Sequence, residues 1–157
     1  MTNNHTLALK IAAVLWIVWG LVHMFAGIAT MARDTPEAVQ GIADGVDEAV
    51  LDVTYPDAAG AIINQHGFNL FWIGAVTLVC AYFIWPRSMH AAFLAGLVGG
   101  LADVGYFVFL DLGGYVNFVP DTVMTIFSAS AIALTAWVWF SHRSEIEPEV
   151  LANARAR

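Results

Sequence analysis

Four polar side chains with chemical potential stand inside long apolar stretches of this sequence: His23, His66, Asn69 and Asp103. Imidazole and carboxylate groups can transfer protons or ligate metal ions, and an amide can hold a substrate through hydrogen bonds. Asp103 is the most informative of the four, because exposing a carboxylate to the middle of a bilayer costs roughly 3 kcal/mol or more. We therefore expect Asp103 to face protein or water rather than lipid.

A carboxylate at that depth needs a partner that stabilises it. No lysine or arginine occurs at a comparable depth in any apolar stretch, so a basic side chain is not available to Asp103. A buried carboxylate must then be hydrogen-bonded, carry a proton or bind a metal ion. The candidate partners are His23, His66, Asn69, Tyr106 and the hydroxyl groups near the end of the chain, Thr125, Ser128 and Thr135.

Three kinds of site are compatible with these side chains. Two imidazoles and a carboxylate form a donor set typical of zinc and non-haem iron, so His23, His66 and Asp103 could together hold a divalent metal ion. No short metal-binding motif supports this set, because its members come from three separate stretches. Alternatively, histidine and aspartate act as an acid/base pair with Asn69 beside them. A haem ligated by His23 and His66 is the third interpretation, and it rests on two histidines alone.

The composition assigns the chain to the membrane. Of its 157 residues 59% are hydrophobic and only 12% are charged, and its mean hydropathy is +0.69. Soluble domains carry about a quarter charged residues, so the shortage indicates an integral membrane protein whose main partner is the lipid bilayer. The net charge of −7 argues against nucleic-acid binding. The single cysteine, Cys80, excludes an internal disulfide and a dithiol redox pair.

Four apolar stretches are long enough to cross a bilayer, which takes about 20 helical residues. They cover residues 7–31, 61–85, 89–110 and 118–140. The connections between the second and third and between the third and fourth are short, which predicts antiparallel neighbours. The predicted fold class is therefore an all-α, four-helix transmembrane bundle. We expect one domain over residues 1–157, with a flexible tail at 141–157.

Positive residues predict the orientation of the bundle. Lys10, Arg87 and Arg143 all fall on one side of the predicted membrane, together with the last two arginines of the chain, and only Arg33 falls on the other. The positive-inside rule then places both termini in the cytoplasm. We expect the protein to reside in a bacterial cytoplasmic (inner) membrane.

A 29-residue acidic loop, residues 32–60, separates the first two apolar stretches and is expected outside the cytoplasm. Thr35 followed by Pro36 predicts a helix start, with Thr35 as the N-cap. Gly41 and Gly45 weaken this helix, so we expect a broken amphipathic segment lying over the bundle. Its acidic residues are Asp34, Glu37, Asp44, Asp47, Glu48, Asp52 and Asp57.

The polar groups fall on one side of the membrane midplane. With a rise of about 1.5 Å per residue, the ionisable side chains of all four stretches lie in the outward half. The last stretch adds a polar stripe at helical spacing, formed by Asp121, Thr125, Ser128 and Thr135. For Asp121, which follows Pro120 directly, we favour a helix cap over a functional role. The pattern predicts a polar pocket that opens outward beneath the acidic loop.

Small residues share a helix face with Asp103. Gly96, Gly99 and Gly100 recur at helical spacing on that face, and small residues allow a neighbouring helix to approach closely. The neighbour can belong to the same chain or to a second copy, so we also consider a homo-oligomer joined through the glycine-rich faces.

These observations favour a membrane enzyme, metal-dependent or acid/base, that acts on a small lipophilic substrate. Two other classes fit the same residues: a binding or transport component for an ion or small ligand, and an accessory subunit whose polar groups only join helices. The sequence contains neither a Gly-x-Ser-x-Gly nucleophile motif nor a phosphate-binding glycine loop. Hydrolysis through a serine elbow and nucleotide chemistry therefore have no support.

Overall fold

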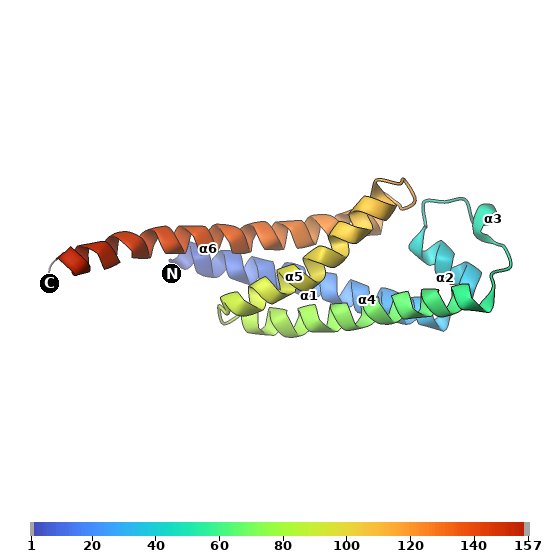
Figure 1. Cartoon of the computed structure of the whole chain (residues 1–157), viewed down its shortest axis with the longest axis horizontal. Coiled ribbons are helices and arrows are strands. Elements are labelled where there is room, and N and C mark those ends of the chain that lie inside the picture. The colour runs from blue at the N-terminus through green and yellow to red at the C-terminus, as the bar shows by residue number, and fades with distance from the viewer. Residues whose placement is uncertain (1, 156–157) are drawn as a thin grey trace.

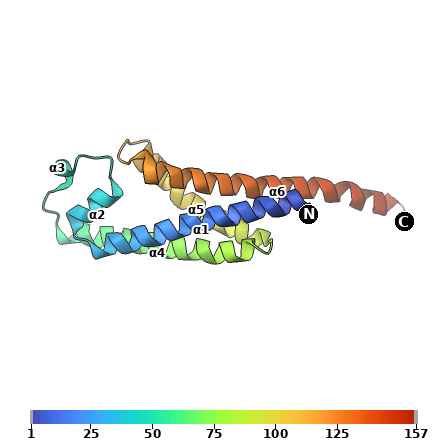
Figure 2. The same cartoon turned by 180° about the vertical axis from the view of Figure 1, so that it is seen from behind.

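The computed structural model describes the backbone of residues 2–155 and the side chains of residues 2–141. Within this part of the chain the structure contains helices and no strands, as predicted. The long helices are α1 (Asn3–Ala32), α4 (Asp57–Ile84), α5 (Met89–Tyr106) and α6 (Val123–Arg155), and the short ones are α2 (Thr35–Ile42) and α3 (Glu48–Leu51). Both termini lie toward one end of the molecule, the N-terminal end, and α2 and α3 lie at the other, the cap end (Figures 1 and 2).

Two π-helical turns flank the connection between α5 and α6. Helix α5 continues into η1 (Phe107–Asp111), and η2 (Phe118–Thr122) leads into α6. Counting these turns, four segments are long and apolar enough to cross a membrane: Asn3–Ala32, Asp57–Ile84, Met89–Asp111 and Phe118–Ser141. The four predicted stretches are thus confirmed as helices, which indicates an integral membrane protein.

Helix α6 extends beyond the predicted end of the last stretch. Its backbone remains helical to Arg155, well past residue 140. The flexibility predicted for residues 141–157 stays a prediction, because most of those side chains and residues 156–157 lie outside the described part of the chain.

Helices α1 and α4 pack with their backbones in contact. A Cβ atom added to Gly27 would lie 2.5 Å from the carbonyl oxygen of Gly67, and one added to Gly20 would lie 2.8 Å from that of Gly74. Only glycine permits such an approach at these positions, so the two helices run against each other along most of their length. Nothing in the sequence paired these glycines of α1 with those of α4.

The predicted glycine face of α5 contacts large side chains rather than another helix backbone. A Cβ added to Gly99 would lie 2.6 Å from the ring of Trp16, and one added to Gly100 would lie 2.7 Å from Cδ1 of Ile132. These two glycines therefore give space to α1 and α6 of the same chain. Gly99 and Gly100 are therefore covered by their own chain and do not belong to a surface that could meet a second copy.

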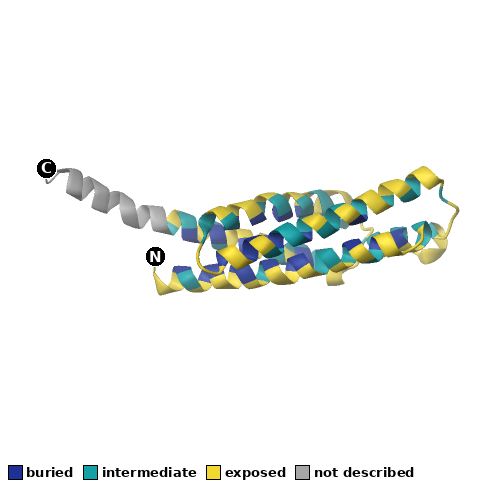
Figure 3. Cartoon of the chain, turned by 90° about the horizontal axis from the view of Figure 1, so that it is seen from below, coloured by how far each residue is buried: buried dark blue, intermediate teal, exposed yellow. Residues whose placement is uncertain are grey.

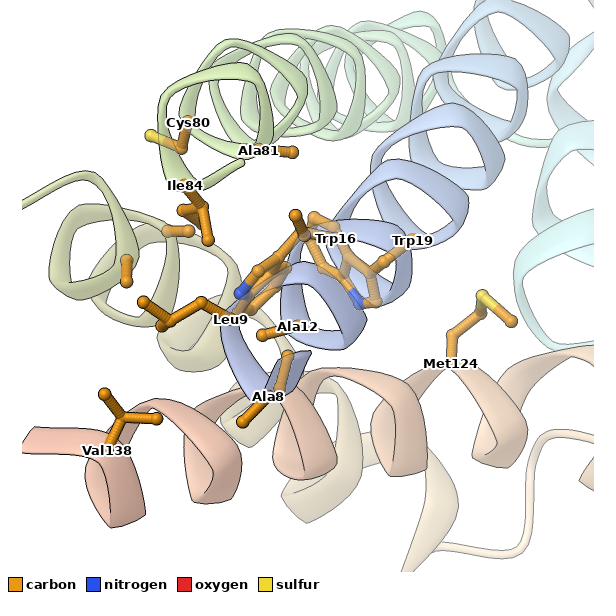
Figure 4. Close-up of a cluster of buried hydrophobic side chains, with 14 residues drawn as sticks. Ala8, Leu9, Ala12, Trp16, Trp19, Cys80, Ala81, Ile84, Met124 and Val138 are labelled. Carbon is orange, nitrogen blue, oxygen red and sulfur yellow. The ribbon is translucent and has the colours of Figure 1, made fainter. Parts of the chain in front are cut away.

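The packed core lies in the half of the bundle nearer the termini (Figure 3). Its fully buried side chains include Leu9, Ala12, Ala13, Trp16, Trp19, Ala81, Ile84, Ala95 and Ala131. Figure 4 shows Trp16 and Trp19 projecting from α1 into the middle of this cluster. The outward faces expose large apolar side chains such as Phe25 (75%) and Phe109 (74%), which suits contact with lipid.

The acidic segment between α1 and α4 folds over the cap end. Helix α2 is capped by Asp34, whose Oδ1 accepts a hydrogen bond from the amide of Glu37 at 3.0 Å. The prediction of Thr35 as the cap is therefore wrong by one residue, since the aspartate before it supplies the oxygen. Beyond α2, the amide of Gly45 donates to the carbonyl of Tyr115 at 3.0 Å. This bond fastens the segment to the connection between α5 and α6.

Candidate functional site

Asp103 points into the bundle from α5 and is held by a tryptophan from α1. The indole Nε1–H of Trp19 donates a hydrogen bond to Oδ2 of Asp103 at 2.8 Å. Asp103 is only 4% exposed, and the side chain of Ser128 from α6 reaches the same carboxylate. The expectation that Asp103 faces protein is therefore confirmed.

His23 lies one helical turn beyond Trp19, and two contacts with Trp19 orient its ring. The two rings are stacked, with centroids 3.6 Å apart and planes inclined by 19°, and Nδ1 of His23 lies 2.8 Å from the backbone carbonyl oxygen of Trp19. A carbonyl oxygen can only accept, so Nδ1 must carry a hydrogen. In the neutral ring this leaves the lone pair on Nε2, which faces Oδ1 of Asp103 at 3.9 Å. That distance is longer than a hydrogen bond.

The pair forms part of the wall of a cavity of about 240 Å³. Five helices contribute to it, α1, α2, α4, α5 and α6, together with η2. The ionisable side chains of its lining are His23, Arg33, His66, Asp103, Tyr106 and Asp121. Apolar side chains such as Leu70 and Met124 complete the wall. The structure thus brings three of the four predicted residues, both histidines and the aspartate, to one cavity.

The course of α5 explains why the cavity lies in the cap-end half. Helix α5 starts beside α4 near the N-terminal end and inclines toward α6 as it approaches the cap end (Figure 1). Space between the four long helices therefore opens toward the cap end. Gly41 and Ile42 of α2 cover this space, since both residues line the cavity.

Asn69 is not part of this arrangement. Its side-chain oxygen accepts a hydrogen bond from Nε1–H of Trp72 at 3.1 Å on an exposed part of α4, and Asn69 does not line the cavity. Because a helix turns by about 100° per residue, His66 and Leu70 share the arc that faces the cavity, while Asn69 lies beyond its edge. The predicted role of Asn69 in the site has no support in this geometry.

The metal hypothesis finds no ligand cluster among the described side chains. Within residues 2–141, no group of three or more histidine, cysteine, aspartate or glutamate side chains is placed to hold a metal ion. His66 lines the same cavity as His23 and Asp103 but completes no such group with them. The zinc or iron site and the haem therefore stay predictions.

Several cavity residues were missed or interpreted differently from the sequence. Trp19 could have been found, because it precedes His23 by four residues on one helix face and a buried indole N–H needs an acceptor. Asp121 was interpreted as a helix cap, but Asn117 precedes η2 and Asp121 lines the cavity instead, in contact with Tyr106. Arg33 gave no sequence signal beyond its position after the first apolar stretch.

The hydroxyl groups of the polar stripe on α6 differ in whether they reach the Asp103 carboxylate. The hydroxyl of Ser128 lies beside Asp103 and donates to the backbone carbonyl of Thr125 at 3.0 Å, and the hydroxyl of Thr135 donates to the backbone carbonyl of Ala131 at 2.9 Å. The buried hydroxyl of Thr125 has no hydrogen-bond partner among the described residues. Only one of the three hydroxyls predicted as partners thus reaches the carboxylate.

Comparison with known proteins adds no functional information: no family model, curated protein or solved structure matches this chain. Any function must therefore be inferred from the cavity itself. Its chemistry is that of two proton-accepting groups, the imidazole Nε2 of His23 and the carboxylate of Asp103, which face each other across a gap and are both positioned by Trp19.

Proposed function

We propose that this protein is a membrane enzyme that performs acid/base chemistry on a small lipophilic molecule bound in the cavity. The observation that carries the proposal is the placement of His23 Nε2 and Asp103 Oδ1, which are 3.9 Å apart in the cavity wall. In this mechanism His23 accepts a proton from the bound molecule, and Asp103 exchanges protons with His23.

The surroundings of the pair support this division of roles. Trp19 engages Nδ1 of His23 through its carbonyl and Oδ2 of Asp103 through its indole, which leaves Nε2 of His23 and Oδ1 of Asp103 facing each other. Both of these atoms are acceptors in their basic forms, and a hydroxyl group of a ligand placed between them can donate to either. Fixing both groups before the ligand binds lowers the cost of orienting them during the reaction.

The cavity wall indicates the class of substrate. Phe25 lines the cavity and is also 75% exposed on the membrane-facing side of α1, so the cavity approaches the lipid beside this residue. The volume of about 240 Å³ lies just below the range of roughly 300–1,000 Å³ common for ligand pockets. A small apolar molecule with one polar group, or the head of a longer one, fits this space.

The orientation in the membrane is part of the proposal. Lys10 and Arg87 lie at the N-terminal end of the bundle and Arg33 at the cap end, which supports cytoplasmic termini and a cap end facing outward from a bacterial cytoplasmic membrane. Reporter fusions at each terminus test this orientation. A reporter that is active outside the cytoplasm contradicts it.

A binding or transport component without catalysis is the second candidate. A more polar hollow of about 510 Å³ lies between α2 and α3, and it shares Arg33 and Gly41 with the inner cavity. Two adjoining hollows favour passage of an ion or small ligand from the cap end to the His23–Asp103 pair.

The test begins with the molecules that remain bound to the purified protein. Lipophilic compounds retained by the wild type in lipid nanodiscs are extracted and compared by mass spectrometry with those retained by Asp103→Asn and His23→Gln. Asn69→Ala is the matched control, because Asn69 lies at a similar depth outside the cavity. We expect retention by the wild type and the control, and reduced retention by the two cavity variants.

Catalysis is then separated from binding by incubating the retained compound with the protein in D₂O. An acid/base enzyme converts the compound or incorporates deuterium at a carbon, and both effects disappear in Asp103→Asn. Retention without conversion or deuterium incorporation favours the binding component. Equal retention by all variants contradicts both candidates.

A further inference from the structure

Among the titratable side chains of the cavity that have no part in the mechanism above, Tyr106 and Asp121 are in contact with each other. Tyr106 lies one helical turn after Asp103 on α5, and Asp121 belongs to η2. Both line the same cavity as Asp103, and the two side chains are within hydrogen-bonding reach of each other. The Tyr106 hydroxyl donates in this contact because a carboxylate can only accept.

Asp121 is joined on its other side to the cap segment. Its carboxyl group meets that of Asp44, which lies just after α2. A proton between two carboxyl groups makes a hydrogen bond, so this contact suits proton exchange. Asp44 is therefore the member of the series that reaches the surface of the cap end.

Asp44 is held in place by the connection between α5 and α6. Its Oδ1 accepts from the amide of Asn117 at 2.7 Å, and its backbone carbonyl accepts from the side-chain amide of Asn117 at 2.9 Å. The adjacent Gly45 lies so close to this connection that an added Cβ would be 2.9 Å from the backbone of Val116. These contacts fix Asp44 over Asp121.

Other charged groups face the same region. Arg33 and His66 lie on the cavity wall, and Asp111 lies near Asp121 with its Oδ1 accepting from the hydroxyl of Thr122. The buried Oδ2 of Asp111 has no hydrogen-bond partner among the described residues, and Asp111 acts on Tyr106 and Asp121 through its charge alone, whereas hydrogen bonds join Tyr106 to Asp121 and Asp121 to Asp44. Chains of this kind are typical of proton relays in membrane proteins.

We propose that Tyr106, Asp121 and Asp44 form a path that carries protons between the His23–Asp103 pair and water at the cap end. This proposal rests on the acid/base function, in which a proton that His23 takes from the bound molecule and passes to Asp103 must leave the pair before the next turnover.

Each transfer along the path leaves its groups as they were. Asp44 releases a proton to water and takes one from Asp121. Asp121 takes a proton from the hydroxyl of Tyr106, while the oxygen of Tyr106 accepts one from Asp103 through a water molecule in the cavity. The net result is the movement of one proton from Asp103 to the cap-end surface, with no other bond made or broken.

Hydrogen–deuterium exchange of the Asp103 carboxyl group tests the path directly. The carboxyl stretching band of the full-length protein in nanodiscs is identified by its loss in Asp103→Asn, and its shift after mixing with D₂O is followed by infrared spectroscopy. We expect Asp121→Asn and Tyr106→Phe to slow this exchange about a hundredfold, the lower range for removing a positioned proton-transfer group.

Asp44→Asn is the most selective variant, because asparagine keeps the side-chain oxygen that accepts from Asn117 but cannot carry the proton. Asp52→Asn in the same cap segment is the matched control and should exchange like the wild type. Helical content measured by circular dichroism confirms that each variant folds. If Asp121→Asn does not fold, the exchange rate of Tyr106→Phe tests the path.

The possible failures point to different proposals. Unchanged exchange in Tyr106→Phe and Asp44→Asn overturns the path while leaving the acid/base function intact. A spectrum with no Asp103-dependent carboxyl band at any accessible pH overturns the proton-exchanging role of Asp103, and with it the proposed function.

Discussion

The two halves of the bundle fill the space between their helices in different ways. In the N-terminal half, alanine and tryptophan side chains interlock until residues such as Ala12, Trp16 and Ala131 have no exposed surface. In the cap-end half the same helices surround a cavity of about 240 Å³ with ionisable groups in its wall. The difference shows that one pair of helices, α1 and α5, forms a packed core at one end and a cavity wall with ionisable groups at the other.

Trp16 and Trp19 lie at the border between the halves and show the contrast most directly. Both are completely buried, and their rings meet edge to face with centroids 5.6 Å apart. The indole N–H of Trp16 has no hydrogen-bond partner among the described residues, whereas that of Trp19 binds Asp103. Trp16 therefore acts by volume alone, and Trp19 adds a directed polar contact.

The largest expected effect is the loss of stability in Trp16→Ala. Removing the ring leaves a hole against Gly99 in the tightly packed half, which should lower the free energy of unfolding by about 3–5 kcal/mol. Unfolding in mixed detergent micelles measures this change. Trp72→Ala is the control, because Trp72 is exposed on the lipid side, and a comparable loss there contradicts the assignment of the core to the N-terminal half.

A comparison of Trp19→Phe with Trp16→Phe isolates the hydrogen bond to Asp103. Both changes remove similar ring volume, but only Trp19→Phe leaves the buried carboxylate without its donor. We expect Trp19→Phe to be more destabilising by about 1.5–3 kcal/mol, the range for hydrogen bonds to charged groups. Equal destabilisation of the two variants, measured in the same micelles, shows that Asp103 finds another donor.

Larger side chains should be tolerated in one half only. Ala12→Leu adds volume where Ala12 has no exposed surface and should destabilise the protein by about 1–3 kcal/mol. Ala26→Leu fills part of the cavity, so we expect little loss of stability but reduced retention of the bound lipophilic molecule. Unfolding and mass spectrometry check the two effects. If Ala26→Leu is as destabilising as Ala12→Leu, the cap-end half has no cavity of the described size.

The smallest effect is expected for Asn69→Ala. This change removes one exposed hydrogen bond to Trp72, so the free energy of unfolding should change by about 0.5 kcal/mol or less. Retention of the cavity ligand should equal that of the wild type. Reduced retention would show that Asn69 contributes to ligand binding, as the sequence suggested, and that the site extends beyond the cavity lining.

Much of the site was predictable because membrane insertion restricts where ionisable groups can lie. The depth of Asp103 and His23 in apolar stretches predicted that both face the bundle interior, and both line its cavity. The same reasoning placed Asn69 beside them, but Asn69 does not line the cavity, because depth along a helix does not specify direction around it. A shift of one residue turns a side chain by about 100°, enough to move it from cavity to surface.

Asp121 and the α1–α4 glycines show a second limit of the sequence. The local pattern Pro120–Asp121 suits a helix cap, but the carboxylate lies between Tyr106 of α5 and Asp44 of the cap segment, which are distant in sequence. Likewise, Gly27 is unremarkable until Gly67 is found opposite it. Such contacts depend on which helices become neighbours, and no local pattern states that.

By itself, the sequence determined that the chain forms four long apolar helices and that its buried ionisable groups concentrate toward one end. Both results follow from the cost of exposing backbone and charged groups to hydrocarbon, which acts on each helix separately. Only the tertiary structure decided that α5 inclines from α4 toward α6, that a cavity remains where it does so, and that Trp19 orients His23 and Asp103 across that space. These features arise from the fit of side chains between helices, because close packing depends on the shapes of all the neighbours at once.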